Sequence, residues 1–119
     1  PRTTTALYGL TGFSMRADDP LLQELTTVDY FPSTRLPKID LSEGESQDAT
    51  QAKGFIQEPA LKALIANPDY QALETPELKK KALERAVDRV GARVGKVIRA
   101  RKQAGMSLSY ADLLQALTQ

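Results

Sequence analysis

The longest uninterrupted helical pattern in the chain follows Pro76. Proline is well tolerated at the first position of a helix, and no further proline occurs up to the C-terminus. Apolar residues then recur at intervals of four, three, four and three, at Leu83, Val87, Val90, Val94 and Val97. Because this is the spacing of a coiled-coil seam, we predict one long helix to about Ala104, ended by Gly105 in the left-handed conformation.

Shorter helices are predicted from start signals, in which a capping side chain or a proline precedes the first turn. These signals lie at Asp19, Ser46, Pro59, Asn67 and Ser109. The helix from Ser46 is expected to run through Lys53 and to be interrupted at Gly54. Pro59 is expected to restart the helix, with an apolar face within residues 60–66. Residues 33–46 contain proline and glycine and are predicted to be an extended loop that drapes over the core.

The predicted fold class is therefore all-α, with short proline-opened helices packed around one long C-terminal helix. No run of alternating apolar residues favours a strand. Residues 18–119 are expected to form a single helical domain, and residues 1–17 an extended N-terminal arm. The arm is too apolar to remain in water, so we expect it to bind a partner or the body of the fold through Leu7, Tyr8, Leu10 and Phe13.

The composition removes most catalytic chemistry. The chain has no Cys and no His, which excludes disulfides, thiolate nucleophiles and the commonest zinc ligand. The neighbouring carboxylates at residues 18–19 and 43–45 are expected to be solvated caps or loop groups. We predict no enzyme activity, no metal and no cofactor. No run of 18 apolar residues and no signal-peptide core occurs, so a soluble chain without a membrane span is expected.

Charge is distributed unevenly along the chain. Residues 1–59 carry a net charge of −4 and residues 60–119 a net charge of +5. Four cations of the long helix are spaced by four, four and three residues and form one basic ridge: Arg85, Arg89, Arg93 and Lys96. Such a ridge can be a solvated face, or it can bind carboxylates or phosphates. Because the helix contains no aromatic residue for base stacking, we expect carboxylates of this chain or of a neighbouring protein.

Two glycines, Gly91 and Gly95, lie four residues apart inside the same helix. Each lowers helix stability by about 1 kcal/mol relative to alanine. We expect a close packing contact to offset this, either within the domain or with a partner subunit; the alternative is a kink. Both residues are therefore candidate partner-binding positions.

Four motifs follow one another along the chain: Asp19-Pro-Leu-Leu-Gln-Glu-Leu, Leu36-Pro-Lys-Ile, Ala60-Leu-Lys-Ala-Leu-Ile-Ala-Asn-Pro-Asp-Tyr-Gln-Ala-Leu, and a long helix rich in Ala and Arg. Over about residues 18–104 this order resembles the C-terminal region of the large internal, or ejection, proteins of tailed-phage virions. The resemblance implies a location in the phage virion with delivery into the host cell, and it assigns no catalytic residue.

The predicted function is that of a non-catalytic structural module of a virion protein, which packs against other virion proteins or against further copies of itself. The alternative is a small basic helical module that binds nucleic acid through the ridge. Binding of nucleic acid would fall steeply with salt, whereas docking of apolar surface would respond little.

Overall fold

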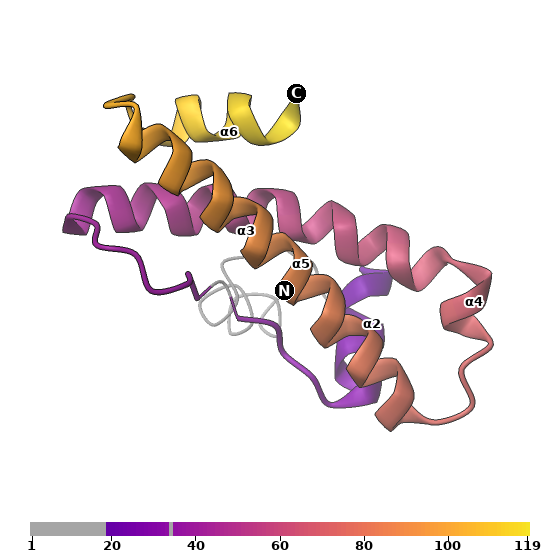
Figure 1. Ribbon diagram of the computed structural model, residues 1–119. Helices are drawn as coiled ribbons and strands as arrows, with labels where there is room; N and C mark the ends of the chain where they lie inside the picture. The colour runs from indigo at the N-terminus through magenta and orange to yellow at the C-terminus, as the bar shows by residue number, and fades with distance from the viewer. Residues whose placement is uncertain (1–18, 34) are drawn as a thin grey trace.

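The computed structural model describes residues 19–33 and 35–119. This part of the chain is all-α, as the sequence predicts, and contains five helices and no strand (Figure 1). The helices are α2 (Pro20–Val28), α3 (Glu43–Ala66), α4 (Pro68–Gln71), α5 (Pro76–Gln103) and α6 (Tyr110–Thr118). The predicted arm, residues 1–17, lies outside the described residues.

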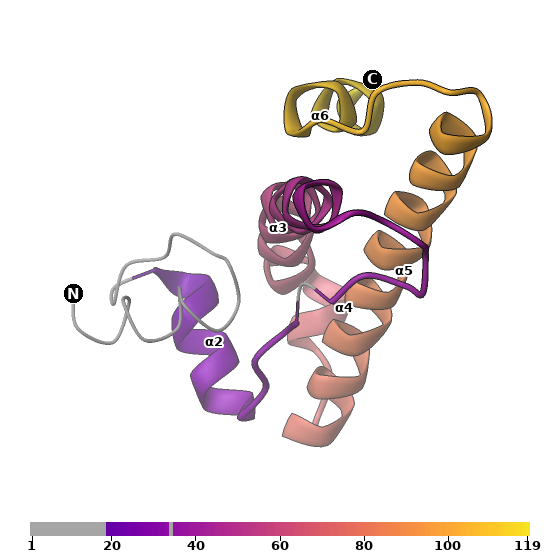
Figure 2. The ribbon, with the colours of Figure 1, turned by 90° about the vertical axis from the view of Figure 1, so that its left-hand side faces the viewer.

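Helices α3 and α5 cross at the centre of the fold, with α2 near one end and α6 near the other (Figures 1 and 2). Two apolar clusters result. The α2 cluster joins α2 to the C-terminal half of α3, α4 and the N-terminal half of α5: Leu21, Leu22, Leu25, Val28, Leu61, Tyr70, Leu83, Ala86 and Val87. The α6 cluster joins α6 to the other halves of α3 and α5: Ala49, Ala52, Val94, Ile98, Leu108, Leu113 and Leu117.

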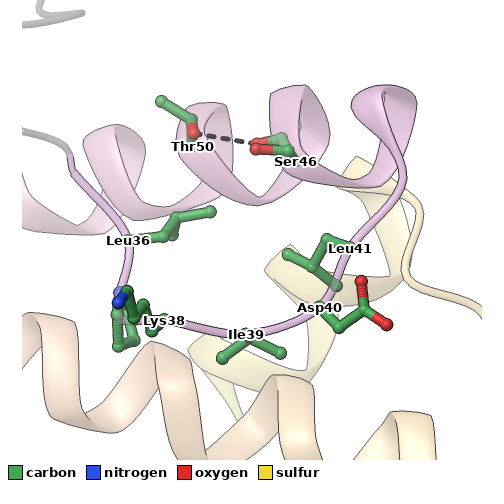
Figure 3. Close-up of a pocket in the computed structure, with 8 residues that line it drawn as sticks. Leu36, Lys38, Ile39, Asp40, Leu41, Ser46 and Thr50 are labelled. Atoms are coloured by element: carbon green, nitrogen blue, oxygen red, sulfur yellow. Dashed lines mark hydrogen bonds between the residues drawn. The ribbon is translucent and has the colours of Figure 1, made fainter.

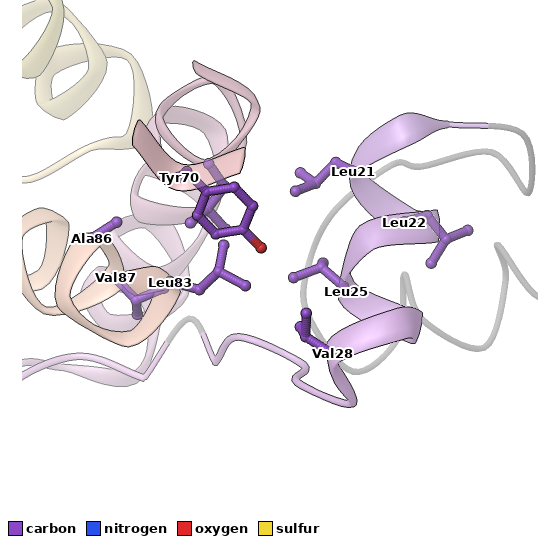
Figure 4. Packing of buried hydrophobic residues seen from close by; sticks show 9 residues of the cluster. Leu21, Leu22, Leu25, Val28, Tyr70, Leu83, Ala86 and Val87 are labelled. Atoms are coloured by element: carbon purple, nitrogen blue, oxygen red, sulfur yellow. The ribbon is translucent and has the colours of Figure 1, made fainter. Parts of the chain in front are cut away.

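Helix α2 forms because its cap and its apolar stripe agree. The Asp19 carboxylate accepts a hydrogen bond from the Leu21 amide at 2.8 Å, and Pro20 occupies the first turn. Leu21 and Leu25 point toward Tyr70 and Leu83 across the α2 cluster (Figure 4). Full burial of each leucine contributes roughly 1.5–3 kcal/mol. The helix therefore belongs to the core.

Helix α3 differs from the prediction. We expected two short helices separated near Gly54, but α3 is one helix of 24 residues. Its N-cap is Ser42, whose hydroxyl accepts from the Glu45 amide at 3.2 Å while the Glu45 carboxylate accepts from the Ser42 amide at 3.0 Å. Pro59 lies inside the helix on the solvent side, so water can hydrate the backbone carbonyl that proline leaves without a donor. Packing in both clusters holds the helix together across this point.

Residues 30–33 and 35–41 of the loop between α2 and α3 are called the strap below. It runs from the end of α2 past α5 to the start of α3, and so drapes over the core as predicted (Figure 2). Leu36, Ile39 and Leu41 pack against the α6 cluster, whereas Tyr30 packs against the α2 cluster. The strap thus connects both halves of the core.

The C-terminal elements follow the predicted boundaries. Helix α5 ends at Gln103, and Gly105 has φ 69°, the left-handed conformation expected there. Ser109 caps α6 by accepting from the Asp112 amide at 3.3 Å. The Asp112 carboxylate accepts hydrogen bonds from Ser107 and from the Ser109 hydroxyl, the latter at 2.9 Å, and both lower the pKa of Asp112. Leu113 and Leu117 are buried in the α6 cluster.

Candidate functional site

The basic ridge of α5 is exposed along its whole length. Arg85, Arg89, Arg93 and Lys96 are all solvent-accessible. None of the four forms an ion pair with a carboxylate of the described residues, whose ion pairs involve Lys62 and Lys79 instead. Arg93 donates a hydrogen bond to the Leu117 carbonyl and so supports the C-terminal end of α6. We expected the ridge to bind carboxylates of this chain or of a neighbouring protein. The described part of this chain supplies no carboxylate that forms an ion pair with it.

A groove of about 400 Å³ lies beside the ridge, between α3 and α5. Small side chains from both helices line it, namely Ala60 and Ala63 of α3 and Ala86 of α5, beside the larger Leu64, Asn67 and Val90. Arg89 and Arg93 of the ridge line the same groove. The groove therefore combines a surface that another backbone can approach closely with two cations that lack a described acidic partner.

The two glycines of α5 meet different neighbours within the chain. At Gly95, which is buried, a Cβ atom would lie 2.9 Å from Cγ of Pro37 in the strap. At Gly91 a Cβ atom would lie 3.6 Å from Cε and 3.8 Å from Nζ of Lys53. At Gly95 the expected close contact is made within the chain, by the strap rather than by another helix. At Gly91 the distance is that of an ordinary contact, and its role in binding a partner stays a prediction. No partner can reach Gly95 while Pro37 covers it.

Two buried polar side chains of α3 hold the strap in place. Lys53 is 3% exposed and donates from Nζ to the Arg35 carbonyl at 2.8 Å and to the Ser33 carbonyl at 3.3 Å. Gln57 is fully buried and donates from Nε2 to the same Ser33 carbonyl at 3.3 Å. Its Oε1 has no hydrogen-bond partner within the described part of the chain. The crossing of α3 and α5 is therefore polar on the strap side.

Burial lowers the pKa of the Lys53 ammonium, while the negative charge of Asp88 on α5 raises it and opposes part of this effect. The nearby Tyr30 hydroxyl is affected in the opposite way: burial raises its pKa to about 12, and the carboxylates of Glu84 and Asp88 add to the shift. Burial of the titrating group is the main cause of both shifts.

A pocket of about 630 Å³ opens between the strap and α5 at this point. Lys53 and Gly91 lie in its wall, together with two further cations, Arg35 and Arg99. Asp88 is the one carboxylate among the described residues that line it. Tyr30, Phe31, Leu36, Pro37, Val87 and Ala92 provide its apolar surface.

A second hollow of about 570 Å³ lies under the later part of the strap, against the first turns of α3. Leu36, Ile39 and Leu41 border it, and the Thr50 hydroxyl on α3 donates to the Ser46 carbonyl at 2.8 Å (Figure 3). Lys38 and Asp40 of the strap also line it, and both are solvent-exposed, so these described residues form no enclosed polar site for a ligand.

Sequence reasoning found the ridge and the glycines but missed Lys53 and Gln57. A signal was present, since Lys53, Gln57 and Leu61 are spaced by four residues and share one helix face. Polar residues in line with a buried leucine indicate a buried polar contact. The expected division of the segment at Gly54 concealed this spacing.

The candidate arm residues Leu7, Tyr8, Leu10 and Phe13 lie outside the described residues. Within residues 19–33 and 35–119, no group of three acidic side chains is placed to hold a metal ion. No described helix is long and apolar enough to cross a membrane. Comparison with family models, curated protein sequences and solved structures gives no match.

Proposed function

We propose that this chain is a non-catalytic docking module that binds an acidic helix of another protein in the groove between α3 and α5. The observation that carries the proposal is the position of Arg89 and Arg93 in a groove with small side chains. Ala60, Ala63 and Ala86 allow another helix to approach the backbone of α3 and α5 closely. The two arginines then meet carboxylates that flank the apolar face of that helix.

The ordered motifs over residues 18–104 support a place for this module in a tailed-phage virion, where its partner is another internal virion protein. Delivery into the host cell with the genome would follow from that placement. Mass spectrometry of particles purified from a host that carries the gene tests this part of the proposal. If particles that contain their other internal proteins lack this chain, the virion placement is contradicted and the docking activity is left open.

Docking is tested with a helical peptide that carries a stripe of alanine and leucine flanked by glutamates. The matched control peptide has glutamine in place of each glutamate. We expect the glutamate peptide to bind at least about 10-fold more tightly at low salt, because charge-assisted hydrogen bonds to arginine add to apolar contact. Equal affinity for the two peptides would refute the role of the ridge.

Variants of the groove provide the second control. Replacing Ala63 by tryptophan fills the groove and should abolish peptide binding. The control variant Ala111→Trp, at an exposed position of α6, should leave peptide binding intact. The ridge is tested by changing Arg85, Arg89 and Lys96 to glutamine while Arg93 is retained, since Arg93 supports α6. Loss of binding in Ala111→Trp as well would indicate a different surface. Sedimentation velocity of the free chain separates self-association from binding of a second protein.

Nucleic acid is the second candidate partner, favoured by the absence of ion pairs from the ridge to carboxylates of the described residues. A phosphate backbone would use the cations but not the apolar surface of the groove. Fluorescence anisotropy with random double-stranded DNA at about 50 mM and about 150 mM salt distinguishes the two. Micromolar affinity at the higher salt that is lost in the triple glutamine variant would replace our first proposal.

A further inference from the structure

We propose that the pocket between the strap and α5 binds a carboxylate carried on a flat apolar body. It lies on a different side of α5 from the docking groove, since the two share no lining residue. The inference is therefore independent of the proposed function.

Cationic side chains outnumber carboxylates among the described residues that line the pocket. Among the described residues, Arg35, Lys53 and Arg99 line it against the carboxylate of Asp88, so these side chains together carry a net positive charge. Neither arginine forms an ion pair with a carboxylate in the described part of the chain. The Arg99 guanidinium lies close to Gly95 of the same helix: its Nη1 atom is 3.4 Å from the point that a Cβ atom would occupy at Gly95. Arginine presents paired donors that match the two oxygens of a carboxylate.

Lys53 has one hydrogen-bond donor more than its two carbonyl partners use. An ammonium group has three N–H donors, and two of them bond to the carbonyls of Ser33 and Arg35. Gly91 lines the pocket beside Nζ and has no side chain to cover it. A bound carboxylate oxygen would accept the third hydrogen bond and bring a negative charge to a cation that is only 3% exposed.

The pocket also has apolar surface next to its charged side chains. Phe31 lines the pocket and remains 43% exposed, so part of its ring is open to a ligand. Tyr30 and Pro37 add further flat surface on the same strap. An aromatic or similarly flat group next to the carboxylate would cover Phe31. We favour a singly charged carboxylate over a doubly charged phosphate ester because Asp88 repels the second charge.

Nuclear magnetic resonance titration with phenylacetate tests the pocket, with neutral phenylacetamide as the matched probe. We expect shift changes at the backbone amides of Asp88, Gly91 and Ala92, and at least about 10-fold weaker binding of the amide. Phenyl phosphate should bind no more tightly than phenylacetate. Equal affinity of phenylacetamide, preference for the phosphate, or shifts away from these amides would overturn the proposal.

Three variants complete the test. Arg99→Gln should weaken phenylacetate binding at least about 5-fold, and Arg85→Gln, on the ridge, should not change it. Asp88→Asn removes the opposing charge and should tighten binding several-fold, a gain that unfolding cannot produce. No change in Arg99→Gln together with no gain in Asp88→Asn would refute the assignment.

The natural carboxylate could belong to a free small molecule or to the C-terminal residue of a polypeptide. A pentapeptide that ends in phenylalanine, compared with the same peptide amidated at its C-terminus, distinguishes these sources. Tighter binding of the free-acid peptide than of phenylacetate assigns the pocket to a chain terminus. Weaker binding of that peptide than of phenylacetate assigns it to a small molecule.

Discussion

The contact between Pro37 and Gly95 predicts opposite effects for two alanine substitutions one turn apart in α5. In Gly91→Ala the new Cβ atom lies 3.6 Å from Cε of Lys53, an ordinary contact with a flexible side chain. The variant should gain helix propensity and become more stable by about 0.5–1 kcal/mol. In Gly95→Ala the new atom lies 2.9 Å from Cγ of Pro37, which is too close for two carbon atoms.

The cost of Gly95→Ala follows from the displacement it requires. Pro37 is part of a ring in a strap that Lys53 holds nearby, so the strap or the helix must shift. Overfilling a packed contact typically costs about 1–3 kcal/mol, against which the gain in helix propensity is about 1 kcal/mol. We expect a net loss of up to about 2 kcal/mol, and a difference of about 1–3 kcal/mol between the two alanine variants.

Equilibrium unfolding in urea measures this difference, with circular dichroism at 222 nm as the signal. The two variants and the parent chain should share one slope of free energy against urea, so that changes in midpoint report stability. In thermal unfolding, about 1 kcal/mol corresponds to roughly 4 °C for a chain of this size.

A double-mutant cycle identifies the cause. Pro37→Ala removes the ring atom that the new Cβ would meet, although it also makes the unfolded chain more flexible. In that background Gly95→Ala should lose its penalty, with a coupling free energy of about 1–3 kcal/mol. The reasoning is refuted if Gly95→Ala is as stabilising as Gly91→Ala, or if its penalty is unchanged when Pro37 is replaced.

Three further predictions concern other parts of the fold. Ser42→Ala should lower the free energy of unfolding by about 1 kcal/mol through loss of the cap of α3, whereas Ser46→Ala should be nearly neutral; urea midpoints that reverse this order would contradict the assigned N-cap. Lys53→Met should release the strap, so that proteolysis within it is faster while helix content is retained; unchanged cleavage would show that the strap needs no latch. The pKa of Tyr30 is about 12 in the folded protein, against an ordinary value of 10.0. The stability that this group contributes below pH 10 should therefore be lost as pH rises through 12, and Tyr30→Phe should reduce this loss. Equal pH dependence of the free energy of unfolding in the two proteins would argue against a buried hydroxyl.

Helix starts were predictable where the signal is local. Asp19, Asn67 and Ser109 each bond to an amide two or three residues later, so a short stretch of sequence contains both partners. The end of α5 was predictable for the same reason, because Gly105 can adopt a positive φ without steric strain. The start of α3 was placed at Ser46 rather than Ser42, although the Ser42–Glu45 capping box is also a local pattern.

The candidate site was predictable only in part. The ridge follows from the spacing of cations on one helix, and its exposure is observed. The groove beside it depends on how α3 lies against α5, which no local pattern specifies. The pocket depends on three separate segments, because Arg35, Lys53 and Arg99 meet only when the strap crosses between α3 and α5.

The sequence by itself determined the all-α class, the long helix α5 and most of the helix caps, since these depend on backbone preferences and contacts within a few residues. Tertiary structure decided the continuity of α3 through Pro59 and the neighbours of the two α5 glycines. A proline inside a helix is unfavourable locally, but α3 buries residues in both clusters on either side of it, and the resulting burial outweighs one lost hydrogen bond. Likewise, Gly95 is needed because Pro37, far away in sequence, packs directly against the backbone of α5.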